Sequence, residues 1–217
     1  MAATKPKSNL RTLGLVLWAL VVVALAGVAW TKFGAPRLEA VTDAGTAQLG
    51  QGDYRATATD GTAFTQDSLK GQPSAVFFGF TNCPDVCPTT LGDIASWREE
   101  LGDQAKDLRV FFVTVDPERD PIDTLREYVS WVPGVIGVSG TPDEMAKVIK
   151  AFRIYARKSP SKDGSYSMDH SSTMLLFDRN GEYAGLIGYQ EERSRALASL
   201  RSKRQSNPWK KHDNIPL

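Results

Sequence analysis

One segment, residues 75–88, constrains the fold of this chain more than any other. AVFFGF (75–80) is a short run of aromatic and β-branched residues, which is typical of a buried strand. TNCPDVCP (81–88) follows it, and apolar residues then recur at helical spacing as far as Arg98. The only two cysteines among the 217 residues therefore lie where a strand ends and a helix begins.

This junction favours sulfur chemistry. Backbone N–H groups converge at the start of a helix and its dipole favours anions, so we expect thiolates to form more easily there than in free cysteine. The spacing of Cys83 and Cys87 leaves three interpretations open: a disulfide, a thiol redox pair or a metal site. Two cysteines allow one disulfide at most, so the chain is not a disulfide scaffold.

A metal site at the cysteines would need further ligands from elsewhere in the chain. Of the two histidines, His170 lies in YSMDHSS (166–172), a loop predicted to lead into a strand at Thr173, and His212 lies in a polar tail. One helical turn would bring the two sulfurs to one side, and distant loops of a sheet protein can meet at one edge. Two thiolates and an imidazole suit Cu(I) or zinc, whereas structural zinc sites normally have four protein ligands.

Acidic side chains near these residues have less specific interpretations. Asp85 and Asp169 are either turn formers or acceptors that orient ligands. The segment VDPERD (115–120) is predicted to be a capped helix start with surface ion pairs, formed by Asp116, Glu118, Arg119 and Asp120.

The remaining pattern predicts an α/β domain with a central sheet and helices on its faces. A hairpin is expected around Asp60-Gly61 and another around Asn180-Gly181, while residues 158–167 are polar and turn-rich. The predicted strands are 75–80, 108–115, 135–138, 173–177 and 182–189, and the predicted helices cover 88–98, 122–131, 141–155 and 191–203.

The amino-terminal part predicts export. Residues 13–30 carry no charge and would span about 27 Å as a helix. Basic residues precede this run, which predicts a transmembrane anchor with the domain outside the cytoplasm or matrix; a signal peptide cleaved near Ala24-Leu25-Ala26 is the alternative. The expected organisation is a cytoplasmic amino terminus (1–12), the anchor (13–30), a spacer (31–53), the domain (54–203) and a basic tail (204–217). The formal net charge of +1 gives no argument for a nucleic-acid partner.

Three motifs in this order, FGFTNCPDVCP (78–88), VDPERD (115–120) and YSMDHSS (166–172), resemble the SCO/SenC family of membrane-anchored copper proteins. The resemblance covers roughly Tyr54 to Lys203 and implies a thioredoxin-like fold with a mixed sheet. It places the copper ligands on Cys83, Cys87 and His170. It gives no ligand role to the surrounding acids, which are candidates for orienting the ligands through hydrogen bonds: Asp85, Asp116 and Asp169.

The resemblance also implies a function. Proteins of this family help to assemble the binuclear copper centre of cytochrome c oxidase, so the implied role is a copper metallochaperone rather than an enzyme. The implied partners are a copper-accepting oxidase subunit and an upstream copper donor or thiol reductant. A thiol-disulfide reductase that keeps the acceptor's cysteines reduced, or a copper or redox sensor, would use the same residues. The expected location is the periplasmic face of a bacterial inner membrane in preference to the mitochondrial intermembrane space.

The chain departs from thioredoxin-like oxidoreductases at the cysteines. Three residues rather than two separate Cys83 from Cys87, and Ser171-Ser172 precede Thr173 where those enzymes have a proline. Both differences favour metal binding over dithiol exchange. Met168 stands where the family more often has valine, and its thioether is a weak additional donor.

Overall fold

The computed structural model describes residues 10–29, 48–161 and 164–205. The chain divides into two compact units, residues 1–44 and 45–217, and each is described by itself. Most of the predicted spacer, nearly all of the basic tail and His212 lie outside the described residues.

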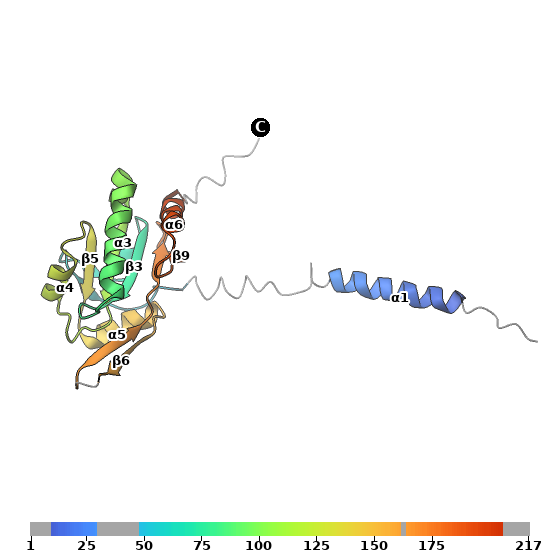
Figure 1. Ribbon diagram of the computed structural model, residues 1–217, viewed down its shortest axis with the longest axis horizontal. Coiled ribbons are helices and arrows are strands. Elements are labelled where there is room, and N and C mark those ends of the chain that lie inside the picture. Colours follow the sequence, from blue (N-terminus) through green and yellow to red (C-terminus); the bar gives the residue numbers. More distant parts are fainter. Residues whose placement is uncertain (1–9, 30–47, 162–163, 206–217) are drawn as a thin grey trace, which may run out of the picture. The chain divides into compact units, whose positions relative to one another are not determined.

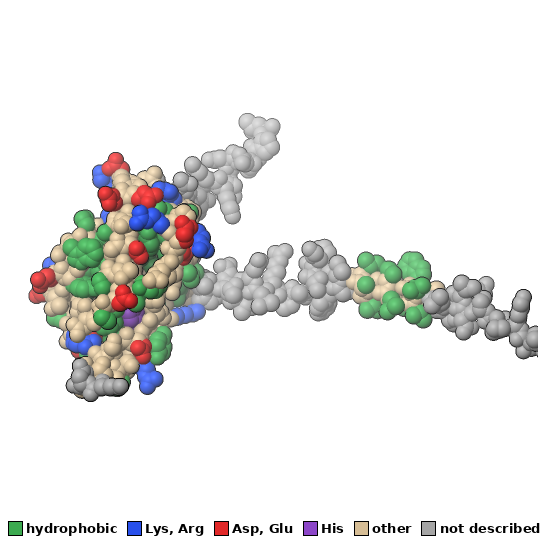
Figure 2. All heavy atoms as spheres, viewed as in Figure 1, with side chains coloured by type: hydrophobic (Ala, Val, Ile, Leu, Met, Phe, Trp, Pro, Cys, Tyr) green, Lys and Arg blue, Asp and Glu red, His purple; other side chains and the backbone are tan. Residues whose placement is uncertain are grey.

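The first unit contains helix α1 (Leu10–Ala29), which covers most of the predicted apolar segment 13–30. Its described large side chains are exposed, including Leu15 and Trp18, and hydrophobic side chains follow the helix along its length (Figure 2). Among the residues that the structure describes, no helix combines the length and the apolar character that crossing a membrane requires.

The second unit is built on a mixed seven-stranded sheet with the order β2-β1-β5-β4-β3-β8-β9. Figure 1 labels β5, β3 and β9 of this sheet. The central strands β3, β4 and β5 are parallel, and every other neighbouring pair is antiparallel. The expected α/β architecture with a mixed sheet is thus confirmed. The strands are β1 (Ala56–Ala58), β2 (Ala63–Phe64), β3 (Ser74–Gly79), β4 (Arg109–Thr114), β5 (Val135–Ser139), β8 (Met174–Phe177) and β9 (Tyr183–Ile187).

Helices cover both faces of this sheet because the central strand is apolar on both sides. Phe77 packs edge-on against Phe112, which in turn contacts Tyr128 of α4. Phe78 points to the opposite face and packs against Phe152, which follows α5. The helices are α3 (Val86–Leu101), α4 (Ile122–Val129), α5 (Pro142–Ala151) and α6 (Arg193–Gln205), with short 3-10 helices η2 (Gln66–Leu69) and η3 (Gly102–Asp107).

Local signals in the sequence predict several boundaries correctly. Helix α5 begins after Thr141, whose side chain accepts a hydrogen bond from the backbone N–H of Glu144, with a proline in the first turn. Asp60-Gly61 joins β1 to β2, and Asn180-Gly181 joins β8 to β9. These turns depend on glycine, since Gly61 and Gly181 both have positive φ.

Two local predictions are wrong. Helix α3 begins at Val86 rather than Pro88, which places Cys87 in its first turn. Residues 158–167 were expected to be irregular and His170 to lie in a loop, yet strands β6 (Ala156–Pro160) and β7 (Tyr166–His170) pair as a separate antiparallel hairpin. The side chains of β6 are all exposed or half-buried, so its sequence lacks the apolar alternation that announces a strand.

The sheet topology brings three distant segments to one edge. Strands β3 and β4 run in parallel, and their last residues, Gly79 and Thr114, are partners in the register. Strand β8 is antiparallel to β3, and its first residue, Met174, pairs with Phe77. The segments that follow β3 and β4 and the segment that precedes β8 therefore meet at this edge. These are the three motifs of the sequence.

Candidate metal centre

The two cysteines occupy the junction of β3 and α3. Cys83 is half-buried and precedes the helix, whereas Cys87 is fully buried in its first turn. The backbone N–H of Cys87 donates to the sulfur of Cys83 over 3.4 Å, which holds the two residues together without a covalent bond. Both are free cysteines, so this structure does not contain the disulfide that was one of the three interpretations of their spacing.

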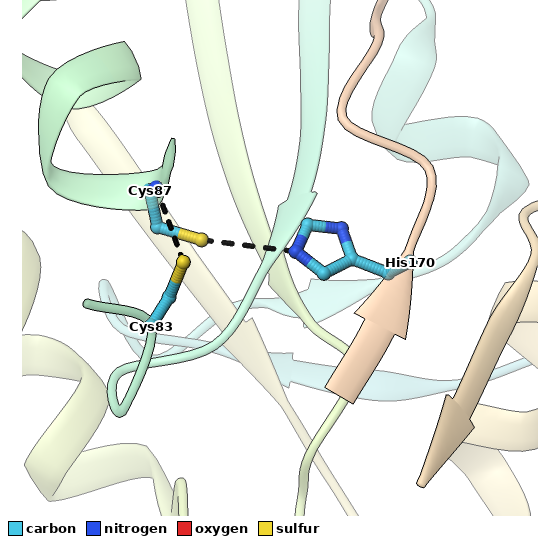
Figure 3. A group of neighbouring side chains, drawn as sticks. All are labelled: Cys83, Cys87 and His170. Carbon is cyan, nitrogen blue, oxygen red and sulfur yellow. Dashed lines mark hydrogen bonds between the residues drawn. The ribbon is translucent and has the colours of Figure 1, made fainter. Parts of the chain in front are cut away.

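His170 lies at the end of β7, with its ring nitrogens in different environments. Nδ1 is 2.9 Å from the backbone carbonyl oxygen of Ser171. Because a carbonyl oxygen only accepts hydrogen bonds, Nδ1 must carry a proton, and the neutral ring then keeps a lone pair on Nε2. Nε2 lies 3.9 Å from the sulfur of Cys87 and points toward it (Figure 3).

The structure thus brings together Cys83, Cys87 and His170. Their ligand atoms all lie within 4.8 Å of one another, although the histidine is 83 residues from Cys87. Figure 3 shows the two sulfurs on one side and the imidazole, from a different strand, on the other. Metal bonds to sulfur and nitrogen of about 2.0–2.3 Å would separate three ligands by up to about 4 Å, so small movements would close this group around one ion.

A cavity of about 330 Å³ opens beside these ligands. Cys83 and His170 both line it, together with apolar side chains that include Phe80, Pro84 and Met168. At its rim Tyr155 is 57% exposed. The site is therefore closed on the side of buried Cys87 and accessible on the side of Cys83 and His170.

Burial controls the protonation of the ligands. Desolvation raises the pKa of the Cys87 thiol, and the nearby Cys83 and Asp120 raise it further. The expectation that helix position promotes thiolate formation is therefore wrong for Cys87, because burial favours the neutral thiol. Desolvation also lowers the pKa of His170, against the opposing effect of its bond to Ser171. The metal-free site at neutral pH thus holds a neutral imidazole and, at Cys87, a neutral thiol.

Gly79 gives the Cys87 sulfur room to lie against the sheet. A Cβ atom at this position would lie 2.9 Å from Cys87 Sγ and 2.7 Å from Phe112 Cζ. Both separations are shorter than side chains tolerate, and both neighbours are buried. A residue other than glycine would push the sulfur away from its present position.

Asp116 acts on the hairpin rather than on the ligands. Its buried carboxylate accepts hydrogen bonds from Arg119 Nε and, over 2.9 Å, from the hydroxyl of Tyr166 in β7. Arg119 also donates from Nη1 to the backbone oxygen of Tyr166 over 2.8 Å and stacks over its ring. These contacts hold β7, the strand that carries His170.

Asp120 is buried in the same segment and contacts the cysteine loop. It accepts hydrogen bonds from Thr81 and from Thr114 at the end of β4. The prediction of surface ion pairs in VDPERD is therefore wrong for Asp116 and Asp120. It holds for Glu118, which is exposed and pairs with Lys158 over 2.6 Å. Sequence position could have indicated a structural role for Asp116 and Asp120, because both directly follow a predicted buried strand, where loops of a sheet protein meet.

The other two acidic candidates are exposed. Asp85 precedes α3 and accepts a hydrogen bond from the Thr89 hydroxyl over 3.3 Å. Asp169 neighbours His170 on β7 and acts on its ring only electrostatically. The acceptor that orients the imidazole is instead the carbonyl of Ser171. Sequence reasoning missed it because every residue has a backbone carbonyl.

Comparison with known proteins adds independent findings. The model of the SCO1/SenC family matches residues 42–205. Protein SCO2, mitochondrial, of Saccharomyces cerevisiae is 34% identical over 168 residues, covering 75% of this chain and 55% of the relative. The SCO2-like protein RP587 of Rickettsia prowazekii is 38% identical over 135 residues, covering 61% of this chain and 66% of the relative. The chain thus spans less than two thirds of the length of these relatives.

Solved structures share the fold. ScoI of Bradyrhizobium japonicum with copper bound is 42% identical, with a TM-score of 0.65 over 71% of this chain and 99% of that chain. Yeast Sco1 with copper bound is 30% identical, with a TM-score of 0.67 over 78% of this chain and 96% of that chain.

We predict that Gly79→Ala displaces the Cys87 sulfur and lowers the free energy of unfolding by about 1–3 kcal/mol, the usual cost of overfilling a packed core. Chemical denaturation measures the stability, and alkylation followed by peptide mass spectrometry measures the reactivity of Cys87, which should rise. Gly92→Ala is the control, because a Cβ there has nothing within 4 Å. Unchanged stability and unchanged Cys87 reactivity in Gly79→Ala would contradict the packing argument.

Proposed function

The chain belongs to the SCO1/SenC family, and we propose that it is a copper metallochaperone that delivers copper to the binuclear copper centre of cytochrome c oxidase. Its copper ligands in this proposal are Cys83, Cys87 and His170. The observation that carries the proposal is the convergence of their three ligand atoms within 4.8 Å. The copper-bound ScoI and Sco1 structures, which share the fold, support it.

The donor set suits copper. Two cysteine sulfurs and one imidazole are soft to intermediate donors, which favour Cu(I) over hard cations such as Mg²⁺ or Ca²⁺. His170 is prepared for binding, since its neutral ring directs the Nε2 lone pair toward the sulfurs. Cys87 must lose its proton when copper binds, so loading releases protons.

Transfer requires that an acceptor reach the bound ion. Cys83 and His170 border the open cavity, whereas Cys87 is buried behind them. A sulfur or nitrogen donor of the acceptor can therefore approach from the cavity and bind copper before the chaperone's ligands release it. A closed four-ligand site would resist such exchange.

Thiol-disulfide reduction uses the same cysteines but fits the site less well. In that reaction Cys83 would attack and the buried Cys87 would resolve, and a resolving thiol also reacts as a thiolate. Desolvation raises the pKa of Cys87, which disfavours that thiolate. His170 also has no necessary role in exchange between dithiols and disulfides. A reductase should turn over a disulfide substrate without copper and should be indifferent to His170→Ala.

We further propose that segment 13–30 anchors the chain in a bacterial inner membrane, with the copper-binding domain in the periplasm. The segment has no charged residue, and Lys5, Lys7 and Arg11 precede it. The large side chains described in α1 are apolar, and nothing within the first unit buries them.

Copper titration of the full-length chain in detergent tests the metal site. We expect one equivalent of tightly bound Cu(I) in the wild type and none in the Cys83→Ser, Cys87→Ser double variant. His170→Ala should weaken Cu(II) more than Cu(I), because Cu(II) prefers nitrogen and oxygen donors. Ser172→Ala, which alters the cavity lining but removes no ligand, is the control. Equal uptake by the wild type and the double variant would refute the proposal.

Copper affinity should depend on pH. Because the pKa of Cys87 is raised, its thiol keeps its proton through neutral pH, and copper must displace that proton. The apparent Cu(I) affinity should therefore rise by at least about tenfold per pH unit between about pH 6 and about pH 8. Competition with a colorimetric Cu(I) chelator at several pH values measures this slope. A flat profile would mean that the thiol is already ionised.

Membrane extraction tests the anchor. Cells that express the full chain should retain it in membranes washed with alkaline carbonate. Replacing two apolar residues one helical turn apart, Leu17→Lys with Val21→Lys, should release it, because each buried lysine costs about 3 kcal/mol. Trp131→Lys is the control, since Trp131 is exposed in the second unit. Release of the wild type by carbonate would count against the anchor.

A further inference from the structure

We propose that Asp120 is a positioning residue for the copper site: its buried carboxylate holds Thr81, and through Thr81 it fixes the loop that carries Cys83. This inference rests on the proposed copper site and adds a residue to it. Asp120 is not itself a ligand, because its carboxylate does not belong to the group of converging ligand atoms.

The carboxylate contacts the cysteine loop twice. Oδ1 accepts a hydrogen bond from the Thr81 hydroxyl over 2.5 Å, and Oδ2 accepts one from the Thr81 backbone N–H over 3.0 Å. Asp120 is 0% exposed, so water does not compete for these bonds. Breaking them would leave a buried charge short of partners, which costs more than the loss of an ordinary hydrogen bond.

Asp120 is itself held by the sheet. The hydroxyl of Thr114, at the end of β4, donates to Oδ2 over 2.6 Å. The hydroxyl of Ser139, at the end of β5, donates to the backbone oxygen of Asp120 over 2.6 Å. Both residues are buried. The carboxylate is therefore a fixed point of the sheet edge to which the loop is attached.

The attachment lies close to the ligands. Thr81 is two residues before Cys83, whose backbone N–H donates to the oxygen of Phe80 over 3.3 Å. The sulfur of Cys83 is in turn held by the N–H of Cys87. Movement at Thr81 would therefore move the sulfur of Cys83 relative to Cys87 and His170.

The same segment holds the opposite half of the site. Asp116 accepts a hydrogen bond from Tyr166 of β7, the strand that ends at His170. Residues 116–120 thus connect both ligand-bearing segments to one loop. In this arrangement Asp120 sets the position of the sulfurs, and the separation between sulfur and imidazole depends on it.

The test compares two variants that each remove one hydroxyl hydrogen bond in the full-length chain. Thr81→Val removes the hydroxyl bond from the cysteine loop to Asp120 and keeps the backbone one. Ser74→Ala, the control, removes the hydroxyl bond of another buried residue to the oxygen of Gln72, at the opposite end of β3. Thr81→Ser keeps the hydroxyl and serves as the rescue. The readouts are Cu(I) affinity, the alkylation rate of Cys83 in the metal-free protein, and thermal unfolding.

We expect Thr81→Val to weaken Cu(I) binding by about tenfold, the typical effect of losing a group that orients a ligand, and to speed alkylation of Cys83. Thr81→Ser should retain both wild-type values. Ser74→Ala should lower thermal stability but leave copper affinity and alkylation unchanged. Asp120→Asn should speed alkylation of Cys83 as Thr81→Val does, and combining the two should add little to that rate.

Several results would overturn the inference. They are wild-type copper affinity and alkylation in Thr81→Val, equal losses of affinity in Thr81→Val and Ser74→Ala, or failure of Thr81→Ser to rescue. If Thr81→Val does not fold, Thr81→Ala is measured against the same control. A wild type that binds no Cu(I) would reject the copper function, while the alkylation rates would still decide the role of Asp120.

Discussion

The candidate site depends on the register of β3 with its two neighbours. Strand β3 pairs in parallel with β4 and antiparallel with β8. The carboxyl ends of β3 and β4 and the segment that precedes β8 therefore lie at the same edge of the sheet. No local interaction would otherwise bring His170 to Cys87, since 83 residues separate them. A shift of one residue in β8 would exchange the side chains that its two buried faces present to the core. Because the core is closely packed on both faces, it favours the register that brings the three residues together.

Burial then decides the chemistry of those ligands. The same core that fixes β3 surrounds Cys87, and the absence of a side chain at Gly79 leaves room for the sulfur beside this strand. Desolvation keeps this thiol and the imidazole of His170 neutral without metal. Metal binding at Cys87 would therefore release a proton. The half-buried Cys83 and the cavity leave one side of the site open, as the proposed transfer of copper requires.

Charged groups hold this arrangement at a distance from the ligands. Asp116 and Asp120 are buried in one short segment, and each accepts hydrogen bonds from a different ligand-bearing segment, Asp116 from β7 and Asp120 from the cysteine loop. Buried carboxylates are stable only when they are fully hydrogen-bonded, so such residues strongly restrain what they contact. Asp85 and Asp169 are nearer to the ligands in sequence, but they are exposed and do not restrain the ligand-bearing segments in the same way.

The sequence alone determined the strand that precedes the cysteines, the mixed α/β class, the turns at Asp60-Gly61 and Asn180-Gly181, and the identity of the three residues that converge. These follow from local apolar patterns, turn chemistry and motif resemblance, which short stretches carry. Only the tertiary structure decided that β6 and β7 form a hairpin, that Cys87 is desolvated, that Ser171 orients His170 and that Asp120 is buried. Each of these depends on contacts between residues that are distant in the sequence. The polar pattern of β6 does not predict a strand, and a backbone carbonyl is present in every residue, so neither identifies its partner from the sequence.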